Sequence, residues 1–187
     1  EPALLEPVER RRIDRERQCV YGGADVVEPY DHLVIATGSQ PFVPPVEGLK
    51  DTAGQPKAGV FVFRSLDDCD AITKAAQTAR RAAVIGGGLL GLEAARGLLN
   101  LGLEVHVVHL MPGLMEVQLD SPASRVLEQT LTGMGLHVHL EKATTGILGT
   151  ETVTGLAFKD GSTLDCDMVV ISAGIRPHVA LAREAGL

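Results

Sequence analysis

The sequence predicts an α/β protein with a Rossmann-like parallel sheet, helices and an antiparallel crossover hairpin layer, flanked by remnants of a second domain of the same plan. Three observations predict this fold. Residues 82–110 have the pattern strand, glycine turn, helix, strand. Two distant segments, 31–38 and 167–174, share a second pattern, with an acid first, an apolar run next and a glycine last. Each of these segments follows a stretch typical of a β-hairpin.

The glycine turn is the most informative motif. Gly86, Gly88 and Gly91 have the spacing G-x-G-x-x-G between a short apolar strand and a helix. In a dinucleotide-binding turn the first glycine permits the sharp turn, the second lets a pyrophosphate approach the backbone, and the third allows close packing of the helix on the sheet. The helix N-terminus then favours the anion. A purely structural glycine turn is the alternative interpretation.

The segment after the turn completes a β-α-β unit. Apolar residues continue with helical spacing to Leu99, Gly102 can end the helix, and residues 104–110 form a valine-rich strand. In such units an acid near the end of the second strand binds the ribose of NAD, whereas an arginine suits NADP. His109 occupies this place, 23 residues after Gly86. A neutral imidazole could bind the ribose and a protonated one a phosphate. No Arg or Lys follows before Lys142, which favours NADH.

The N-terminal third is expected to contain a hairpin and a buried strand. Residues 9–17 mix both signs of charge without aromatic residues, which favours a solvated hairpin strand over a nucleic-acid patch. The further elements expected here are a strand at 18–21, a turn at 22–25, a return strand at 26–28, a buried strand at 30–38 and a proline-rich irregular linker at 41–56.

The remaining elements follow the rules for helix ends and hairpins. Ser65 is expected to cap a helix that runs to Arg81, and Asp120 with Pro122 to begin a helix that ends at 133–135. The other expected elements are strands at 60–64 and 137–140, antiparallel hairpins from 149 with a turn at 160–161, a strand at 167–174, and a helix at 179–185.

The repeated segments predict the domain organisation. The second copy has the glycine loop upstream, whereas only about thirty residues precede the first copy. We therefore expect residues 1–45 to be the tail of a dinucleotide-binding domain plus a linker, with that domain's own phosphate loop before residue 1. Residues 46–176 would be a second, nucleotide-binding domain, and residues 177–187 would return to the first. The alternative is a small natural protein with an N-terminal hairpin extension.

Composition excludes several functional classes. The 187 residues carry a net charge of −7, which argues against nucleic acid and against an anionic membrane surface. The sequence has no apolar run that could span a membrane and no signal-peptide pattern, so a cytoplasmic protein is expected. The three cysteines form no close pair, so neither a redox disulfide nor a Cys-ligated metal is predicted. His137 and His139 could share a strand face and a metal, but a plain strand pattern is favoured.

A family resemblance rests on three of these segments together. The sequence resembles the pyridine-nucleotide:disulfide-type flavoprotein reductases in Asp31 with Ala36-Thr37-Gly38, in the loop 86–93, and in the strand exit 173–177. Within that family, residues 63–68 and 107–120 are similar to the large subunits of NAD(P)H-dependent assimilatory nitrite reductases.

The resemblance implies that NAD(P)H binds this chain and passes hydride to FAD, and that in nitrite reductases electrons continue through iron–sulfur centres to sirohaem, where nitrite becomes ammonia. It implies a pyrophosphate at the glycine loop, the nicotinamide and flavin near Glu93, the adenosine ribose near His109, and the nicotinamide under Gly174. FAD would touch the Ala36 to Gly38 segment. The full set of cofactor-binding candidates is Gly86, Gly87, Gly88, Leu89, Leu90, Gly91, Glu93, His109, Ala173, Gly174, Ala36, Thr37 and Gly38.

The sequence contains no catalytic triad or carboxylate pair, as expected for hydride transfer, which depends on positioning. Ligands for sirohaem or iron–sulfur clusters are absent from the sequence, so this chain alone is not expected to reduce nitrite. The expected partner is the rest of its own polypeptide, and a homodimer is compatible with the pattern. Two alternatives stay open: an NADH oxidase or a rubredoxin or ferredoxin reductase, and a non-catalytic dinucleotide-binding module. Glu93 also has an alternative interpretation, as an acid in the first turn of its helix.

Overall fold

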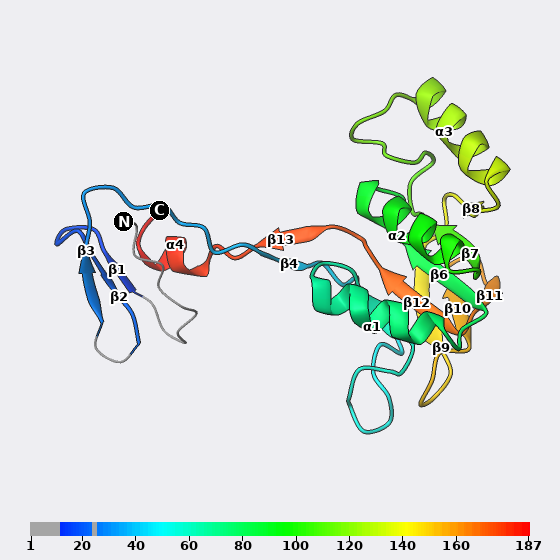
Figure 1. Ribbon diagram of the computed structural model, residues 1–187, viewed down its shortest axis with the longest axis horizontal. Coiled ribbons are helices and arrows are strands. Elements are labelled where there is room, and N and C mark those ends of the chain that lie inside the picture. The colour runs from blue at the N-terminus through cyan, green and yellow to red at the C-terminus, as the bar shows by residue number, and fades with distance from the viewer. Residues whose placement is uncertain (1–11, 24–25) are drawn as a thin grey trace. The chain divides into compact units, whose positions relative to one another are not determined.

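The computed structural model describes residues 12–23 and 26–187, and these residues form two compact units (Figure 1). The terminal unit comprises the described residues up to Gln40 together with Arg176–Leu187. The central unit is Pro41–Ile175. Strands β4 (Ser39–Pro41) and β13 (Ile175–Pro177) pair with each other where the chain passes from one unit to the other and back.

The terminal unit contains a three-stranded antiparallel sheet in the order β1-β2-β3. Helix α4 (Ala180–Glu184) contacts β1, and the Arg15 guanidinium donates a hydrogen bond of 3.0 Å to the carbonyl of Gly186. The hairpin predicted for this region is confirmed, although residues 9–11 and 24–25 of that prediction lie outside the described residues. The strand bounds are β1 Arg12–Asp14, β2 Cys19–Tyr21 and β3 Val27–Pro29.

The buried strand predicted at 30–38 is wrong. Residues 31–38 have no regular secondary structure, and Val34 is 85% exposed. A buried parallel strand needs a hydrogen-bonded neighbour on each side and a layer on each face. None of the described strands pairs with residues 31–38, so the apolar run has nothing to be buried against.

The central unit is built on a five-stranded parallel sheet in the order β5-β12-β6-β7-β8. Its elements are β5 Val60–Val62, α1 Leu66–Ala76, β6 Arg81–Ile85, α2 Leu89–Asn100, β7 Glu104–Val108, α3 Ser121–Gly133, β8 His137–His139, β9 Thr144–Leu148, β10 Gly155–Phe158, β11 Thr163–Asp165 and β12 Met168–Ile171. The predicted β-α-β unit is thus confirmed as β6-α2-β7. The antiparallel sheet, in the order β11-β10-β9, begins at Thr144, earlier than the predicted hairpins.

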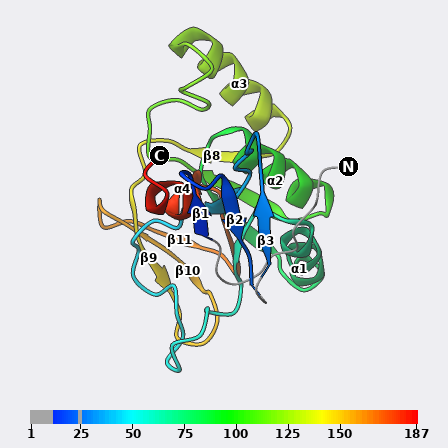
Figure 2. The same cartoon turned by 90° about the vertical axis from the view of Figure 1, so that its left-hand side faces the viewer.

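Alternating side chains of the parallel sheet form two cores. Ala82 and Val84 of β6 pack with residues of α1, α2 and α3. Ala83 and Ile85 pack on the opposite face with residues of the antiparallel sheet, among them Leu156. The central unit is therefore a three-layer arrangement of helices, parallel sheet and antiparallel sheet, and Figure 2 shows α1, α2 and α3 on one side with β9, β10 and β11 on the other. Burial on both faces explains the apolar runs in β6 and β12.

The helix boundaries follow local capping. The Ser65 hydroxyl accepts the backbone N–H of Asp68 and the Asp68 carboxylate accepts that of Ser65, which forms the predicted cap of α1. The Asp120 carboxylate caps α3 in the predicted way. The predicted extension of α1 to Arg81 is wrong. The Asp167 carboxylate accepts the backbone N–H groups of Arg80 and Arg81, each at 3.0 Å, and this places both residues at the start of the sheet instead.

Among the described residues, every helix falls short of the length and apolar character that crossing a membrane requires.

Candidate functional site

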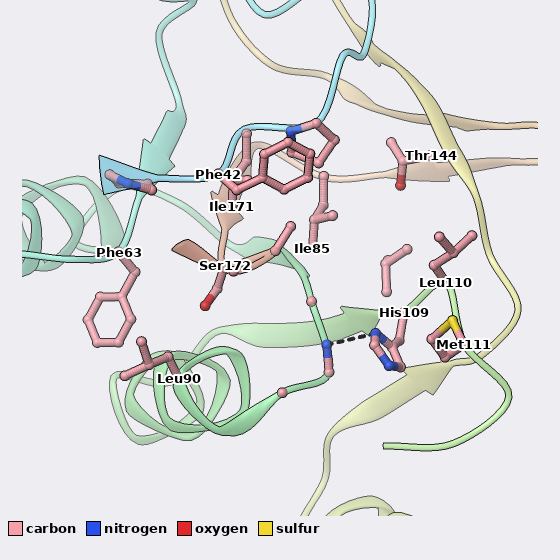
Figure 3. Close-up of a pocket in the computed structure, with 18 of the residues that line it drawn as sticks. Phe42, Phe63, Ile85, Leu90, His109, Leu110, Met111, Thr144, Ile171 and Ser172 are labelled. Atoms are coloured by element: carbon pink, nitrogen blue, oxygen red, sulfur yellow. Dashed lines mark hydrogen bonds between the residues drawn. The ribbon is translucent and has the colours of Figure 1, made fainter. Parts of the chain in front are cut away.

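A cavity of about 790 Å³ lies in the central unit, where the carboxyl ends of β6, β7 and β12 meet (Figure 3). The residues that leave these strands line it: Gly86 after β6, His109 after β7 and Ser172 after β12. From β6 the sheet grows in one direction through β7 and β8 and in the other through β12 and β5. Such a switch point at the carboxyl ends of parallel strands is where open α/β sheets bind ligands, and the volume suits a small-molecule site.

The three glycines of the motif meet different constraints. Gly86 has φ +128°, and a Cβ added there would lie 2.1 Å from the carbonyl oxygen of Ser172. A Cβ on Gly91 would lie 2.1 Å from the carbonyl oxygen of Gly86. The fold itself therefore requires glycine at both positions. Gly88 differs because its φ is −82° and an added Cβ would have no atom within 4 Å. Nothing in the described chain requires glycine there, so the open space beside Gly88 suits an approaching ligand.

The N-terminus of α2 opens into the cavity with its donors free. Gly88 is the N-cap and makes no side-chain cap, and the first turn contains no acid. The backbone N–H groups of Gly88, Leu89 and Leu90 have no hydrogen-bond partner in the described part of the chain. All three residues line the cavity. Unpaired N–H groups at the positive end of a helix dipole fit a phosphate group.

The walls of the cavity are apolar. Phe42, Phe63, Ile85 and Ile171 line it together with Met111, and Figure 3 shows these side chains around the open space. Such walls suit a flat ring and keep water out. The combination of an anion-binding helix end and apolar walls fits a dinucleotide, which carries a pyrophosphate between two ring systems.

His109 is buried beside the glycine loop and uses both of its ring nitrogens. The backbone N–H of Gly87 donates to His109 Nδ1 at 3.0 Å, drawn as the dashed line in Figure 3. His109 Nε2 lies 3.0 Å from the carboxylate of Glu116. Since Nδ1 accepts, the hydrogen is on Nε2 and is donated to Glu116. The sequence left a ribose or a phosphate open as the partner of His109. In the structure both of its ring nitrogens already have partners within the chain.

Comparisons with known proteins identify the family. A family model described as pyridine nucleotide-disulphide oxidoreductase matches residues 4–187. The chain belongs to this family. Nitrite reductase (NAD(P)H) from Bacillus subtilis (strain 168) is 48% identical over 176 residues, which make up 94% of this chain and 21% of the relative. The nitrite reductase (NAD(P)H) large subunit from Klebsiella oxytoca is 52% identical over 175 residues, 94% of this chain and 18% of the relative.

Solved structures agree with this family. A ferredoxin reductase from Rhodopseudomonas palustris superposes with a TM-score of 0.85 at 32% identity and covers 94% of this chain and 42% of its own. The water-forming NADH oxidase from Lactobacillus brevis, bound to NADH, has a TM-score of 0.75 at 26% identity over 92% of this chain and 38% of its own. The chain spans about a fifth of the length of the nitrite reductases that it matches.

In this member of the family most of the predicted cofactor-binding residues surround one cavity. Gly86 to Leu90, His109, Ala173 and Gly174 line it. Gly91 is buried behind the loop and does not line the cavity. Glu93 is exposed and also lies outside the lining. Its alternative interpretation as a first-turn acid is wrong, because the first turn of α2 contains no acid.

The predicted FAD-contacting residues belong to the terminal unit. Ala36, Thr37 and Gly38 are exposed, and the Thr37 hydroxyl donates to the carbonyl of His178 at 2.6 Å. Sequence reasoning overlooked Glu116, which lies seven residues beyond His109 and lines the cavity. The only signal available was an acid in the loop after the second strand, away from the position where one is expected.

A second polar cluster lies at the β7–β8 edge of the sheet. Ligand atoms of Glu104, His106 and His137 lie within 4.8 Å of one another, and His106 Nδ1 is 2.9 Å from His139 Nε2. Burial lowers the pKa of His106 and of His139. The Arg81 guanidinium pairs with Glu104 at 2.9 Å and places a positive charge beside the cluster. We therefore assign no metal to it.

The cysteines are free thiols in the described chain. Burial raises the pKa of Cys166 to about 12, so its thiol stays protonated and unreactive. The described residues therefore contain no disulfide.

Proposed function

We propose that this chain is the NAD(P)H-binding part of a flavoprotein reductase, in which hydride passes from NAD(P)H to FAD. The observation that carries the proposal is the N-terminus of α2, which has no side-chain cap. Gly88 at this N-terminus has open space beside it and lines an apolar cavity of about 790 Å³. The similarity to nitrite reductases and to an NADH oxidase bound to NADH supports it.

Each part of the cavity has a separate task in this proposal. The N–H groups of Gly88, Leu89 and Leu90 would hold the pyrophosphate. Gly174, which has φ +114° and open space beside it, would lie against the nicotinamide. The apolar walls would orient the ring and exclude water, and the bound nucleotide would supply the hydride. Glu93 lies outside the cavity lining, so its proposed place near the nicotinamide and flavin rests on the family resemblance.

The proposal for the whole protein extends beyond this chain. The relatives named above support an electron-input module of a nitrite reductase. The family resemblance implies that such a reductase converts nitrite to ammonia through iron–sulfur centres and sirohaem, which would be bound elsewhere in the polypeptide. FAD would contact Ala36, Thr37 and Gly38 of the terminal unit. We propose the rest of its own polypeptide as the partner, a cytoplasmic setting with reduced thiols, and a homodimer as its assembly. The chain by itself would not reduce nitrite.

A second candidate is the same module in another electron-transfer protein. An NADH oxidase from Methanocaldococcus jannaschii is 40% identical over 159 residues, and the ferredoxin reductase from Rhodopseudomonas palustris superposes well. These candidates share the nucleotide site and differ in the final acceptor. An assay of the whole polypeptide that contains this chain, with nitrite, oxygen and ferredoxin as electron acceptors, would separate these candidates. Binding of NADH without electron transfer to any of the three would favour a non-catalytic module.

The test of the nucleotide site is calorimetric titration of this chain with NADH and NADPH. Gly88→Glu should weaken NADH binding by at least about 30-fold, because a carboxylate enters the pyrophosphate position and repels it. The control is Gly97→Glu, which adds the same side chain to an exposed position of the same helix with no atom within 4 Å. Unchanged NADH binding in Gly88→Glu, or no binding by the unaltered chain, would contradict the proposed site.

A further inference from the structure

The loop after β7 is fastened to the glycine loop. Met115 has φ +52°, and its backbone N–H donates to the carbonyl of Gly87 at 3.0 Å. Gly87 donates in turn to His109, and His109 donates to Glu116. A Cβ on Gly87 would lie 2.6 Å from Leu114 and 2.7 Å from the His109 ring, so the loop packs tightly on this glycine. These contacts hold the Glu116 carboxylate beside the pyrophosphate loop.

The Glu116 carboxylate keeps one oxygen available. Its Oε2 atom faces His109, and its Oε1 atom has no hydrogen-bond partner among the described residues. The side chain is 37% exposed and lines the cavity. Glu116 therefore presents a fixed acceptor to a ligand, at the carboxyl end of β7, where a ribose lies when the pyrophosphate occupies the helix end.

The remaining charges near this acceptor do not favour an extra phosphate. The described lining of the cavity contains no arginine, and its lysine, Lys142, contacts Asp160 at 2.5 Å and Ser162 at 3.0 Å. The Asp160 carboxylate, whose pKa this lysine lowers, neutralises the ammonium group. A phosphate on the ribose would therefore meet the charge of Glu116 without an unpaired cation, whereas an unmodified diol could donate to it.

We infer that Glu116 is the specificity-determining residue of the nucleotide site, that it accepts the adenosine ribose hydroxyls of NADH and repels the 2′-phosphate of NADPH, and that His109 is a positioning residue that holds it. The inference rests on the proposed function. In other dinucleotide-binding units the acid that selects NADH lies at the end of the second strand. Here His109 occupies that position, and the acid is Glu116 in the loop seven residues later.

The experiment titrates the full 187-residue chain and its variants with NADH and with NADPH. The unaltered chain should bind NADH more tightly than NADPH by at least about 10-fold, since like charges oppose the second ligand. Glu116→Gln should weaken NADH binding and tighten NADPH binding, so that the preference falls to within about threefold. Glu116→Arg should reverse the preference. Glu128→Arg makes the same charge change outside the cavity lining and should leave the preference unchanged.

Two His109 variants separate positioning of Glu116 from support of the glycine loop. The amide nitrogen of Gln reaches the place of Nε2, and the amide oxygen of Asn reaches the place of Nδ1. His109→Gln should therefore retain the donor to Glu116 and the preference for NADH. His109→Asn retains the acceptor for Gly87 and should lose most of the preference. The opposite order would mean that His109 serves the loop alone.

The outcomes distinguish this inference from the proposed function. If the unaltered chain binds neither nucleotide, the proposed function fails. If it binds NADH, Gly88→Glu weakens that binding as expected and Glu116→Gln leaves the NADH to NADPH preference unchanged, the proposed function stands and the inference about Glu116 is overturned.

Discussion

At the scale of single residues, helix α2 contains two glycines with opposite consequences for stability. Gly91 packs against the turn, where an added Cβ would lie 2.1 Å from a carbonyl oxygen. Gly97 lies in the exposed interior of the same helix with no atom within 4 Å. Gly91→Ala should therefore lower the free energy of unfolding by about 2 kcal/mol or more, because the backbone must move. Gly97→Ala should raise it by about 0.5–1 kcal/mol, because alanine is the better helix former.

Urea denaturation of the two variants and the unaltered chain measures both effects. Each alanine serves as the control for the other, since the chemical change and the helix are the same. An equal rise in the free energy of unfolding of both variants would show that helix propensity alone determines the effect of each substitution. It would also show that the close approach of Gly91 to Gly86 is absent in solution.

These residues also show what the sequence could predict at this scale. The spacing of Gly86, Gly88 and Gly91 is visible in the sequence, and it led to the cavity that the structure contains. The link from His109 to Glu116 was not predictable, because it depends on a loop conformation fixed by the bond from Met115 to Gly87. Sequence spacing alone does not show how such a loop returns to the strand.

At the scale of elements, one pattern gives two structures. Within residues 167–174, Met168–Ile171 form β12 in the middle of the parallel sheet, between β5 and β6. Residues 31–38 share the pattern and are exposed without regular structure. The shared pattern of an acid, an apolar run and a glycine indicates that a segment can form a buried strand. The hydrogen-bond partners and the covering layers that such a strand needs come from other segments. The fold of the central unit was therefore predictable from its own sequence, whereas the state of residues 31–38 was not.

The β7–β8 pair carries a pH-dependent contribution to stability. Burial lowers the pKa of His106 and of His139, and the neighbouring charges of His137, Arg81 and Lys142 act in the same direction. The Glu104 carboxylate opposes this for His106. In the unfolded chain both imidazoles have a pKa of about 6.5. As the pH falls below that value the unfolded state binds protons first, so stability decreases.

We expect the free energy of unfolding to be lower at pH 5.5 than at pH 7.5 on account of these two histidines. The pKa of Glu104 is itself lowered, but that contribution is lost only at a pH below this window. Urea denaturation at the two pH values tests the expectation. The double variant His106→Gln, His139→Gln should show a smaller pH dependence of the free energy of unfolding. The control variant His32→Gln changes an exposed histidine and should leave that pH dependence unchanged. An equal pH dependence in all three proteins would contradict the assignment.

At the scale of the whole molecule, the buried core is distributed unequally between the two units. Among the described residues, all of the buried hydrophobic side chains except Ile13 belong to the central unit. The central unit therefore has its own core on both faces of the parallel sheet. The strands β2 and β3 of the terminal unit contain no fully buried residue. A short sheet with one buried hydrophobic residue among its described strands has little to stabilise it.

Hydrogen exchange of the full chain should therefore reveal two stabilities. The amides of β6, β7 and β12 should exchange only through global unfolding, because their strands are central and buried. The amides of β1, β2 and β3 should exchange at least about 100-fold faster, through local opening. Mass spectrometry of peptic fragments, with and without NADH, measures both sets, and NADH should slow the glycine loop without slowing β1 to β3. Equal protection of the two units would show that the terminal unit has a core of its own, and that the division of labour proposed here needs revision.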